Sequence, residues 1–184
     1  MPALVTEFVK TFKTIFKASK PGCIIKKWLK LLFKTIPICN KMEIKTEILI
    51  NAIPDKVWAI LTDFDKYPSW NPFIKYVRKT VKTGSQIEVR IEPPGTKGMI
   101  FYPKVLALEP NKELRWLGHL LFSGLFDGEH SFKIVDNKNG TSTFIHNEYF
   151  TGILVPLFKK QMNTNTKRGF ELMNEKLKEL AEQK

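Results

Sequence analysis

Residues 54–73 read PDKVWAILTDFDKYPSWNPF and predict a short helix followed by a rigid aromatic turn. Pro54 suits the first position of a helix, where its missing N–H would have no partner in any case. The apolar residues after it recur at helical spacing. Residues 66–73 then hold two prolines and three aromatic residues, which restricts the backbone to a turn or a single helical turn. We therefore expect two short helices in this stretch.

The segments on either side of this stretch alternate between apolar and polar residues, which is typical of half-buried strands. One such segment, residues 43–50, precedes it. Six follow it, separated by Gly, Pro and Asn: residues 74–81, 86–92, 98–109, 113–118, 128–136 and 142–151. Consecutive strands with short connections favour an antiparallel meander.

After residue 151 the apolar period becomes helical. The recurring apolar positions are Leu157, Phe158, Met162, Phe170, Met173, Leu177 and Leu180. Because a sheet needs its apolar face covered, we expect this helix to pack across it. The predicted fold class is therefore α+β, a seven-stranded curved antiparallel sheet wrapped on a long C-terminal helix, with two short helices after the first strand. This arrangement leaves room for an apolar cavity between sheet and helix.

The first 41 residues differ from the rest in charge, since they carry nine of the 30 basic residues and one acid, Glu7. Residues 4–16 and 24–36 place apolar side chains at spacings of three and four opposite lysines, which predicts two basic amphipathic helices. We predict an extension over residues 1–41 and one domain over 42–184. Three interpretations of the extension stay open: an anchor on an anionic membrane surface, a helix pair docked on the body or on a partner chain, and an upstream stretch without a selected function.

Several classes of chemistry find no support in the composition. Both cysteines, Cys23 and Cys39, precede Met42, so the body has no thiol for a disulfide, a zinc site or a nucleophile. It also lacks a glycine-rich phosphate loop, HExxH and GxSxG. We expect no metal and no cofactor, and a reducing cytoplasm as the compartment, with peripheral membrane attachment through residues 4–36 as an option. Nucleic acid is disfavoured as a partner because the aromatic residues of the basic segments face away from the lysines.

Four stretches resemble the SRPBCC superfamily, in its polyketide cyclase/dehydrase and lipid-transport-like branch. They are residues 54–73, LRWLG at 114–118 with GLFDGEHSF at 124–132, FTGILVP at 150–156, and GFELMN at 169–174. The resemblance covers residues 42–184 and implies the helix-grip fold shared with START lipid carriers and the birch-pollen allergen group, enclosing a deep apolar cavity. It implies function more loosely, because the superfamily spans carriers, cyclases and co-chaperone-like modules.

The leading functional prediction is a carrier or sensor that binds a hydrophobic small molecule or lipid in an internal cavity. The alternatives are a cyclase- or dehydratase-like enzyme and a module that acts through its surface. The enzyme alternative depends on three polar residues of the last two strands. Alternation places His130 on an apolar, inward face with Phe132, and in the next strand we favour the face of Phe144, His146, Glu148 and Phe150 as inward.

His130, His146 and Glu148 would then lie close together in an apolar pocket, where burial suits acid–base work. We assign no catalytic residue, because a buried trio of this kind more often satisfies its own hydrogen bonds or orients a ligand headgroup. The predicted ligand-binding residues are Trp70, Phe73, Trp116, Phe126, His130, Phe132, Phe144, His146, Glu148, Phe150, Phe158 and Met162. The loop that holds Phe122 and Phe126 is expected to be a lid, a membrane-touching tip or a packed turn.

Overall fold

The structure is a computed structural model that describes residues 40–183. Its larger sheet is antiparallel and has the strand order β1-β8-β7-β6-β5. These strands are β1 (Lys41–Ile50), β5 (Lys104–Glu109), β6 (Glu113–His119), β7 (Asp127–Asp136) and β8 (Ser142–Thr151). The predictions made for residues 4–36 lie outside the described residues, and the boundary between the extension and the domain stays a prediction.

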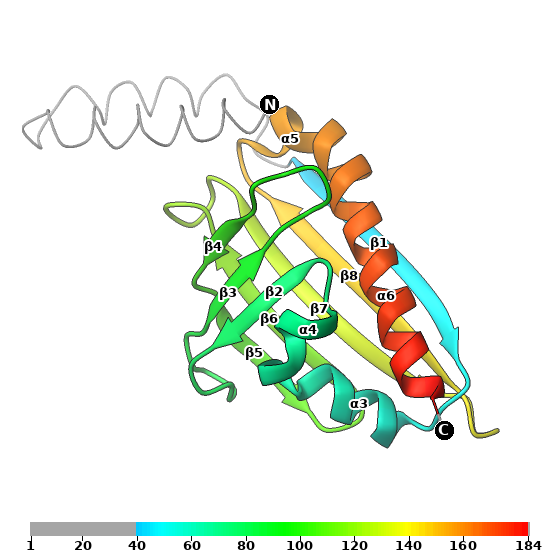
Figure 1. Cartoon of the computed structure of the whole chain (residues 1–184). Helices are drawn as coiled ribbons and strands as arrows, with labels where there is room; N and C mark the ends of the chain where they lie inside the picture. Colours follow the sequence, from blue (N-terminus) through cyan, green and yellow to red (C-terminus); the bar gives the residue numbers. More distant parts are fainter. Residues whose placement is uncertain (1–39, 184) are drawn as a thin grey trace, which may run out of the picture. The chain divides into compact units, whose positions relative to one another are not determined.

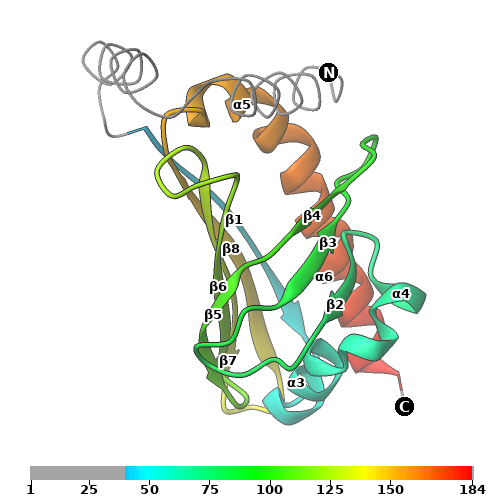
Figure 2. The ribbon, with the colours of Figure 1, turned by 90° about the vertical axis from the view of Figure 1, so that its left-hand side faces the viewer.

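A three-stranded sheet and a long helix form a second layer in front of the larger sheet (Figures 1 and 2). The small sheet has the order β2-β3-β4, with β2 (Ile74–Arg78), β3 (Glu88–Ile91) and β4 (Met99–Phe101). The helix is α6 (Lys167–Glu182), which crosses the larger sheet at β1 and β8. Its buried side chains, Phe170, Met173 and Leu177 among them, join one core with the inward side chains of the strands. The α+β helix-grip prediction is confirmed.

The strand count differs from the prediction because residues 98–109 form two strands instead of one. The break falls at Tyr102 and Pro103, and Pro103 has no N–H to donate to a ladder. The two sheets still meet there, since Ile87 N donates to Pro103 O at 3.0 Å and Val105 N donates to Ser85 O at 2.9 Å. The predicted single curved sheet is thus two ladders joined at a bend.

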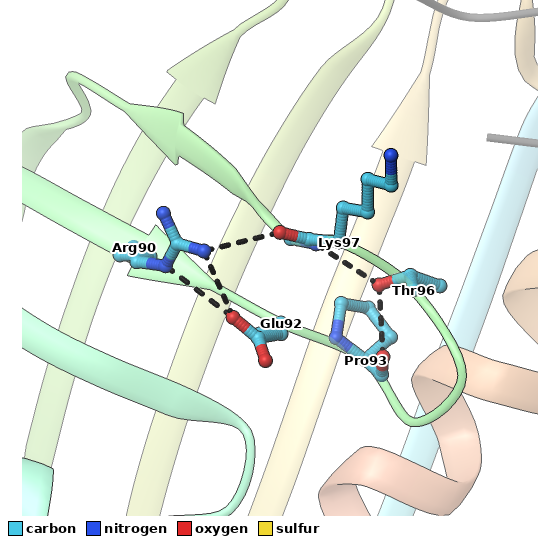
Figure 3. A network of polar contacts seen from close by, with 6 residues as sticks. Arg90, Glu92, Pro93, Thr96 and Lys97 are labelled. Carbon is cyan, nitrogen blue, oxygen red and sulfur yellow. Dashed lines mark hydrogen bonds and ion pairs between the residues drawn. The ribbon is translucent and has the colours of Figure 1, made fainter. Parts of the chain in front are cut away.

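The β3–β4 connection is held by a small polar network (Figure 3). Arg90 Nη2 donates to Glu92 Oε2 at 3.0 Å and to the carbonyl oxygen of Lys97 at 3.1 Å. Thr96 Oγ1 donates to the Pro93 carbonyl oxygen at 2.8 Å. Gly98, with φ of 65°, completes the turn where a Cβ would lie 2.8 Å from the Ile91 carbonyl oxygen. This network shapes the hairpin locally.

The stretch at residues 54–73 folds as expected, into α3 (Pro54–Thr62), the single turn η1 (Phe64–Lys66) and α4 (Tyr67–Trp70). Tyr67 is fully buried and its hydroxyl donates to the Leu61 carbonyl oxygen at 2.5 Å, which ties the turn to α3. Asn71 Oδ1 then accepts hydrogen bonds from the backbone N–H groups of Phe73 and Ile74, at 3.0 and 2.8 Å. This Asn-led turn starts β2 and directs Phe73 into the core.

The C-terminal helix is not regular throughout. It begins as α5 (Val155–Gln161), passes through the π-helical turn η2 (Met162–Thr166) and continues as α6. The wider turn inserts an extra residue between the inward faces of α5 and α6. Within residues 40–183, no helix combines the length and apolar composition needed to cross a membrane.

Candidate functional site

Strand register gathers the polar residues of the interior on one face of the larger sheet. Across neighbouring strands, Trp116 pairs with His130 and His130 with Glu148. In the adjacent row Phe132 pairs with His146, and His146 with Thr46. Because residues two apart in a strand share a face, His130 and His146 are diagonal neighbours. The prediction that these residues and Glu148 face inward is confirmed by their burial.

The two imidazoles are in direct contact, with 2.6 Å between their Nε2 atoms. His146 Nδ1 lies 3.0 Å from Asn174 Oδ1 on α6. Asn174 Nδ2 in turn donates to Thr46 Oγ1 at 2.9 Å. A continuous polar chain thus runs from β1 through α6 and β8 to His130 on β7.

Both imidazoles are neutral in this environment. Each is fully buried, and burial lowers the pKa of His146 to about 3 and the pKa of His130 well below its ordinary value. The neighbouring His146 contributes a further lowering of the pKa of His130. A neutral imidazole has one donor and one acceptor nitrogen, so the short contact is an N–H···N hydrogen bond.

Glu148 lies at the other end of this chain. Its Oε2 is 3.6 Å from His130 Nδ1, too far for a hydrogen bond, and 11% of its side chain is exposed. Burial raises the pKa of this carboxyl to about 8, so it is mostly protonated at neutral pH. Gly128, across the strand pair, leaves room for it, since a Cβ there would lie 2.6 Å from Glu148 Oε1.

Aromatic rings enclose the histidines. His146 stacks on Phe170 of α6, with 3.7 Å between ring centroids and 6° between planes. His130 stacks on Phe132 at 4.6 Å and lies 5.5 Å from Trp116. The Phe73 ring is 6.2 to 6.3 Å from both imidazoles, and it fits because Gly169 has no side chain: a Cβ at Gly169 would lie 2.3 Å from Phe73 Cδ2.

The other predicted ligand-binding residues lie in three places. Phe126 contacts Phe150 and Phe158, at 5.4 Å between ring centroids in each case, beside the entry into α5. Phe144 and Met162 are buried in the core, whereas Trp70 is half-buried and packs edge-on against Tyr67 at 5.2 Å. The structure brings seven predicted residues together: His130, His146, Glu148, Phe73, Trp116, Phe132 and Phe144. It does not bring Trp70 into ring contact with that group.

Sequence reasoning missed two polar members of the chain, Asn174 and Thr46. Asn174 lies four residues after Phe170, on the stripe of buried residues of α6. A polar residue at such an apolar position was the feature of the sequence that could have indicated a buried polar contact. Thr46 alternates with Ile44 and Ile48 on one side of the first strand, where a single threonine is weak evidence for a site. Gly128 and Gly169 gave no signal, because the space they provide depends on side chains distant in sequence.

A surface pocket of about 460 Å³ lies away from these residues. Its lining consists of residues 62–65 with Val77, Arg78, Lys79 and Val81. None of the predicted ligand-binding residues contributes to it. Residues 40–183 also contain no group of three His, Cys, Asp or Glu side chains placed to hold a metal ion.

Comparison with solved structures finds several proteins with a similar fold. An aromatase/cyclase, ZhuI from Streptomyces sp. R1128, matches with a TM-score of 0.63 and 11% identity, over 78% of this chain and 94% of that one. A START superfamily protein from Mycobacterium smegmatis matches with a TM-score of 0.58 and 19% identity, over 75% and 98%. Norcoclaurine synthase from Thalictrum flavum matches with a TM-score of 0.59 and 12% identity, over 78% and 95%. At these identities the likeness concerns the fold alone.

A search of curated proteins finds no match to the chain. The model of one family matches residues 41–182, nearly all of the described region. Its description is polyketide cyclase/dehydrase and lipid transport. By sequence the chain belongs to this family of the SRPBCC superfamily, and its fold agrees with that membership.

Proposed function

We propose that the protein binds a hydrophobic small molecule or lipid between the larger sheet and the C-terminal helix. One observation carries the proposal: His130 Nδ1 is buried among aromatic rings without a hydrogen-bond partner among the described residues. Buried polar atoms are nearly always paired, so an unpaired one in an apolar surround suits the polar group of a ligand. The family's description, which includes lipid transport, agrees with this chemistry.

Native mass spectrometry of the purified full chain tests the proposal. We expect a bound species of a few hundred daltons that is released by denaturation and recovered in an organic extract. The matched sample is the His130→Leu variant, which keeps the site apolar but removes the unpaired nitrogen. Loss or strong reduction of the adduct in that variant supports the proposal. A clean protein mass for the wild type, unchanged by incubation with an organic extract of the host cells, contradicts it.

Acid–base catalysis is the second candidate, and the state of Glu148 favours it. With a pKa of about 8, this carboxyl can both give and take a proton near neutral pH. A suitable probe is 2-tetralone, whose carbon-bound hydrogens next to the carbonyl exchange with D₂O when a base removes them. Catalysis requires exchange faster than that in a His146→Ala/Glu148→Gln double variant. Equal rates would remove the enzyme candidate and leave binding as the function.

Residues 4–36 support a separate proposal, attachment to an anionic membrane surface. The support is their pattern of lysines opposite apolar residues, since each basic residue near anionic lipid contributes about 1 kcal/mol. Flotation of the full chain with phosphatidylserine-containing vesicles is expected, and flotation should fall in a Lys10→Gln/Lys13→Gln/Lys17→Gln variant. Equal flotation of both proteins with neutral and anionic vesicles would contradict an electrostatic anchor.

A further inference from the structure

The hydrogen bonds of the buried polar chain have a fixed direction, which begins at Thr46. The hydroxyl of Thr46 has one proton, and it donates that proton to the His146 carbonyl oxygen at 3.4 Å. Asn174 Nδ2 lies 2.9 Å from Thr46 Oγ1, so the NH₂ group of the amide donates to that oxygen, and the longer Thr46 contact agrees with this direction. The amide oxygen is left facing His146 Nδ1 at 3.0 Å.

This orientation sets the tautomers of both histidines. His146 must carry its proton on Nδ1 in order to donate to Asn174, so its Nε2 has a lone pair. The partner across the 2.6 Å contact, His130 Nε2, then holds the proton between them. Because His130 is a neutral imidazole, its Nδ1 is left as a bare acceptor.

The open end of the chain therefore has a defined hydrogen-bonding character. It presents one acceptor at His130 Nδ1 and, 3.6 Å away, a protonated carboxyl with one donor and one acceptor at Glu148. His130 Nδ1 has no exposed surface of its own, so a ligand reaches it when the partly exposed Glu148 carboxyl moves aside. A hydroxyl placed between the two groups would then donate to the imidazole and accept from the carboxyl. A carboxylate has no proton to donate, and a ketone or ester has none either, so each would leave His130 Nδ1 unpaired.

We propose that His130 and Glu148 recognise a neutral hydroxyl group, an alcohol, phenol or enol, on the hydrophobic ligand. This inference rests on the proposed binding function and names the class of ligand. The chain from Thr46 through Asn174 and His146 acts as a positioning device that holds His130 in the accepting tautomer. Thr46, Asn174 and His146 thus contribute to the preference for a hydroxyl by fixing the tautomer of His130, without having to contact the ligand.

Histidine ¹⁵N NMR of the full chain tests the tautomers without any ligand. We expect His146 to give the pattern of an Nδ1–H imidazole and His130 that of an Nε2–H imidazole at pH 7, each assigned by single His→Gln variants. An Nδ1–H pattern for His130, or a charged imidazolium at either position, would overturn the proposal. The ¹⁵N shifts show which nitrogen of each imidazole carries the proton. They therefore distinguish a hydrogen-bonded chain with the proposed direction from buried histidines that only pack in the core.

Binding of four naphthalene probes to the same labelled protein tests the ligand class. We expect 2-naphthol to bind at least tenfold more tightly than 2-naphthoate, naphthalene or 1-naphthylmethylamine, and to shift the His130 Nδ1 resonance. Equal affinities, or preference for the carboxylate or the ammonium probe, would overturn the inference and leave hydrophobic binding intact. Failure of every probe and of the extracted host lipids to bind would overturn the proposed function and the inference with it.

The Asn174→Leu variant removes the group that sets the direction while keeping a side chain of similar size. In it we expect the His146 tautomer to change and the preference for 2-naphthol over naphthalene to fall below threefold. Glu175→Gln, at the exposed neighbouring position on α6, is the matched variant and should keep the full preference. If Asn174→Leu folds and retains the full preference, the chain does not set specificity.

Discussion

The two ends of the buried polar chain differ in how completely their hydrogen bonds are satisfied. At the Thr46 and Asn174 end, each side-chain group has a partner within the fold, and both lie between α6 and the sheet. At the His130 and Glu148 end, the imidazole nitrogen has no partner among residues 40–183 and the carboxyl keeps part of its surface exposed. We call Thr46 and Asn174 the closed end, because the fold itself satisfies their hydrogen bonds. We call His130 and Glu148 the open end, because the imidazole acceptor there is left for a ligand. One short contact between the imidazoles joins the two ends.

From this difference we infer that Thr46 and Asn174 stabilise the fold, whereas His130 and Glu148 bind the ligand. Changes at the closed end should cost folding free energy, because they leave buried groups unpaired. Changes at the open end should cost little stability and should alter binding instead. Four substitutions test that division, in order of their expected effect on the free energy of unfolding.

Gly169→Ala should give the largest loss of stability, because it crowds the ring of Phe73, which lies beside both imidazoles. The new Cβ would lie 2.3 Å from Phe73 Cδ2, within a packed core that cannot yield freely. We expect the free energy of unfolding to fall by about 3 kcal/mol, measured by urea denaturation. The control is Gly118→Ala, whose Cβ would meet only Pro103 Cβ, at 3.6 Å. A loss below that of the control would show that the rings around the histidines are loosely packed.

Asn174→Leu should come next, since it breaks the closed end. It leaves the His146 Nδ1–H group and the Thr46 hydroxyl oxygen without partners in the core. We expect a loss of about 2 kcal/mol in the free energy of unfolding. Glu175→Gln, at the exposed neighbouring position on α6, serves as the control and should change stability by less than about 0.5 kcal/mol. Wild-type stability in Asn174→Leu would mean that the closed end is not structural.

The pH dependence of stability isolates the open end. The pKa of Glu148 is raised to about 8 in the folded state, so between its ordinary value near 4.5 and 8 the folded protein holds a proton that the unfolded chain has released. Stability therefore falls as pH rises through that window, by about 1 kcal/mol per pH unit. The two histidines act in the opposite direction, since their lowered pKa values make stability fall only as pH drops below about 6.5.

Urea denaturation between pH 7 and 8.5 thus reports mainly on Glu148, because the histidines of the unfolded chain are largely neutral in that interval. We expect the wild type to lose about 1 kcal/mol across this interval and Glu148→Gln to lack this loss. The same loss in both proteins would place the titrating group elsewhere.

Gly128→Ala should have the smallest effect on stability and a clear effect on binding. Its Cβ would lie 2.6 Å from Glu148 Oε1, but that atom is the end of a flexible side chain that can move aside. We expect a loss below about 1 kcal/mol, close to that of Gly118→Ala. The affinity for 2-naphthol should fall several-fold, because the displaced carboxyl no longer faces His130. Unchanged affinity would remove Glu148 from the recognition site.

Much of the fold could be predicted because its signals are local. Alternation left two mixed faces of β8 as candidates for the inward one, and burial confirms the favoured face. The prolines and aromatic residues of 54–73 identified the helices before β2. Pro103, which divides the predicted strand at 98–109, is also a local feature of the sequence, but the prediction of one continuous strand did not use it. The cost of a proline in a strand depends on whether its N–H position faces a partner, which is a property of the sheet.

The candidate site was predicted only in part, because its geometry comes from pairing across the sheet. His130, His146 and Glu148 were identified on inward faces, yet the sequence could not indicate that His130 would lie opposite Glu148 and diagonal to His146. Asn174 was overlooked because one polar residue on an apolar helical stripe has many explanations. The direction of the hydrogen bonds depends on atoms from three elements and has no counterpart in a linear pattern.

The pairing of β1 with β8 also determines when the molecule can fold. Thr46 and His146 are 100 residues apart, and β1 pairs with β8 along its whole length. During synthesis β1 cannot pair until β8 has been made, near the end of the domain. Until then its apolar residues stay uncovered and its edge stays unpaired. Contacts so distant in sequence slow folding, so refolding should take milliseconds to seconds instead of microseconds. Expression yield should accordingly depend on temperature and on chaperone supply more steeply than the stability of the finished domain would suggest.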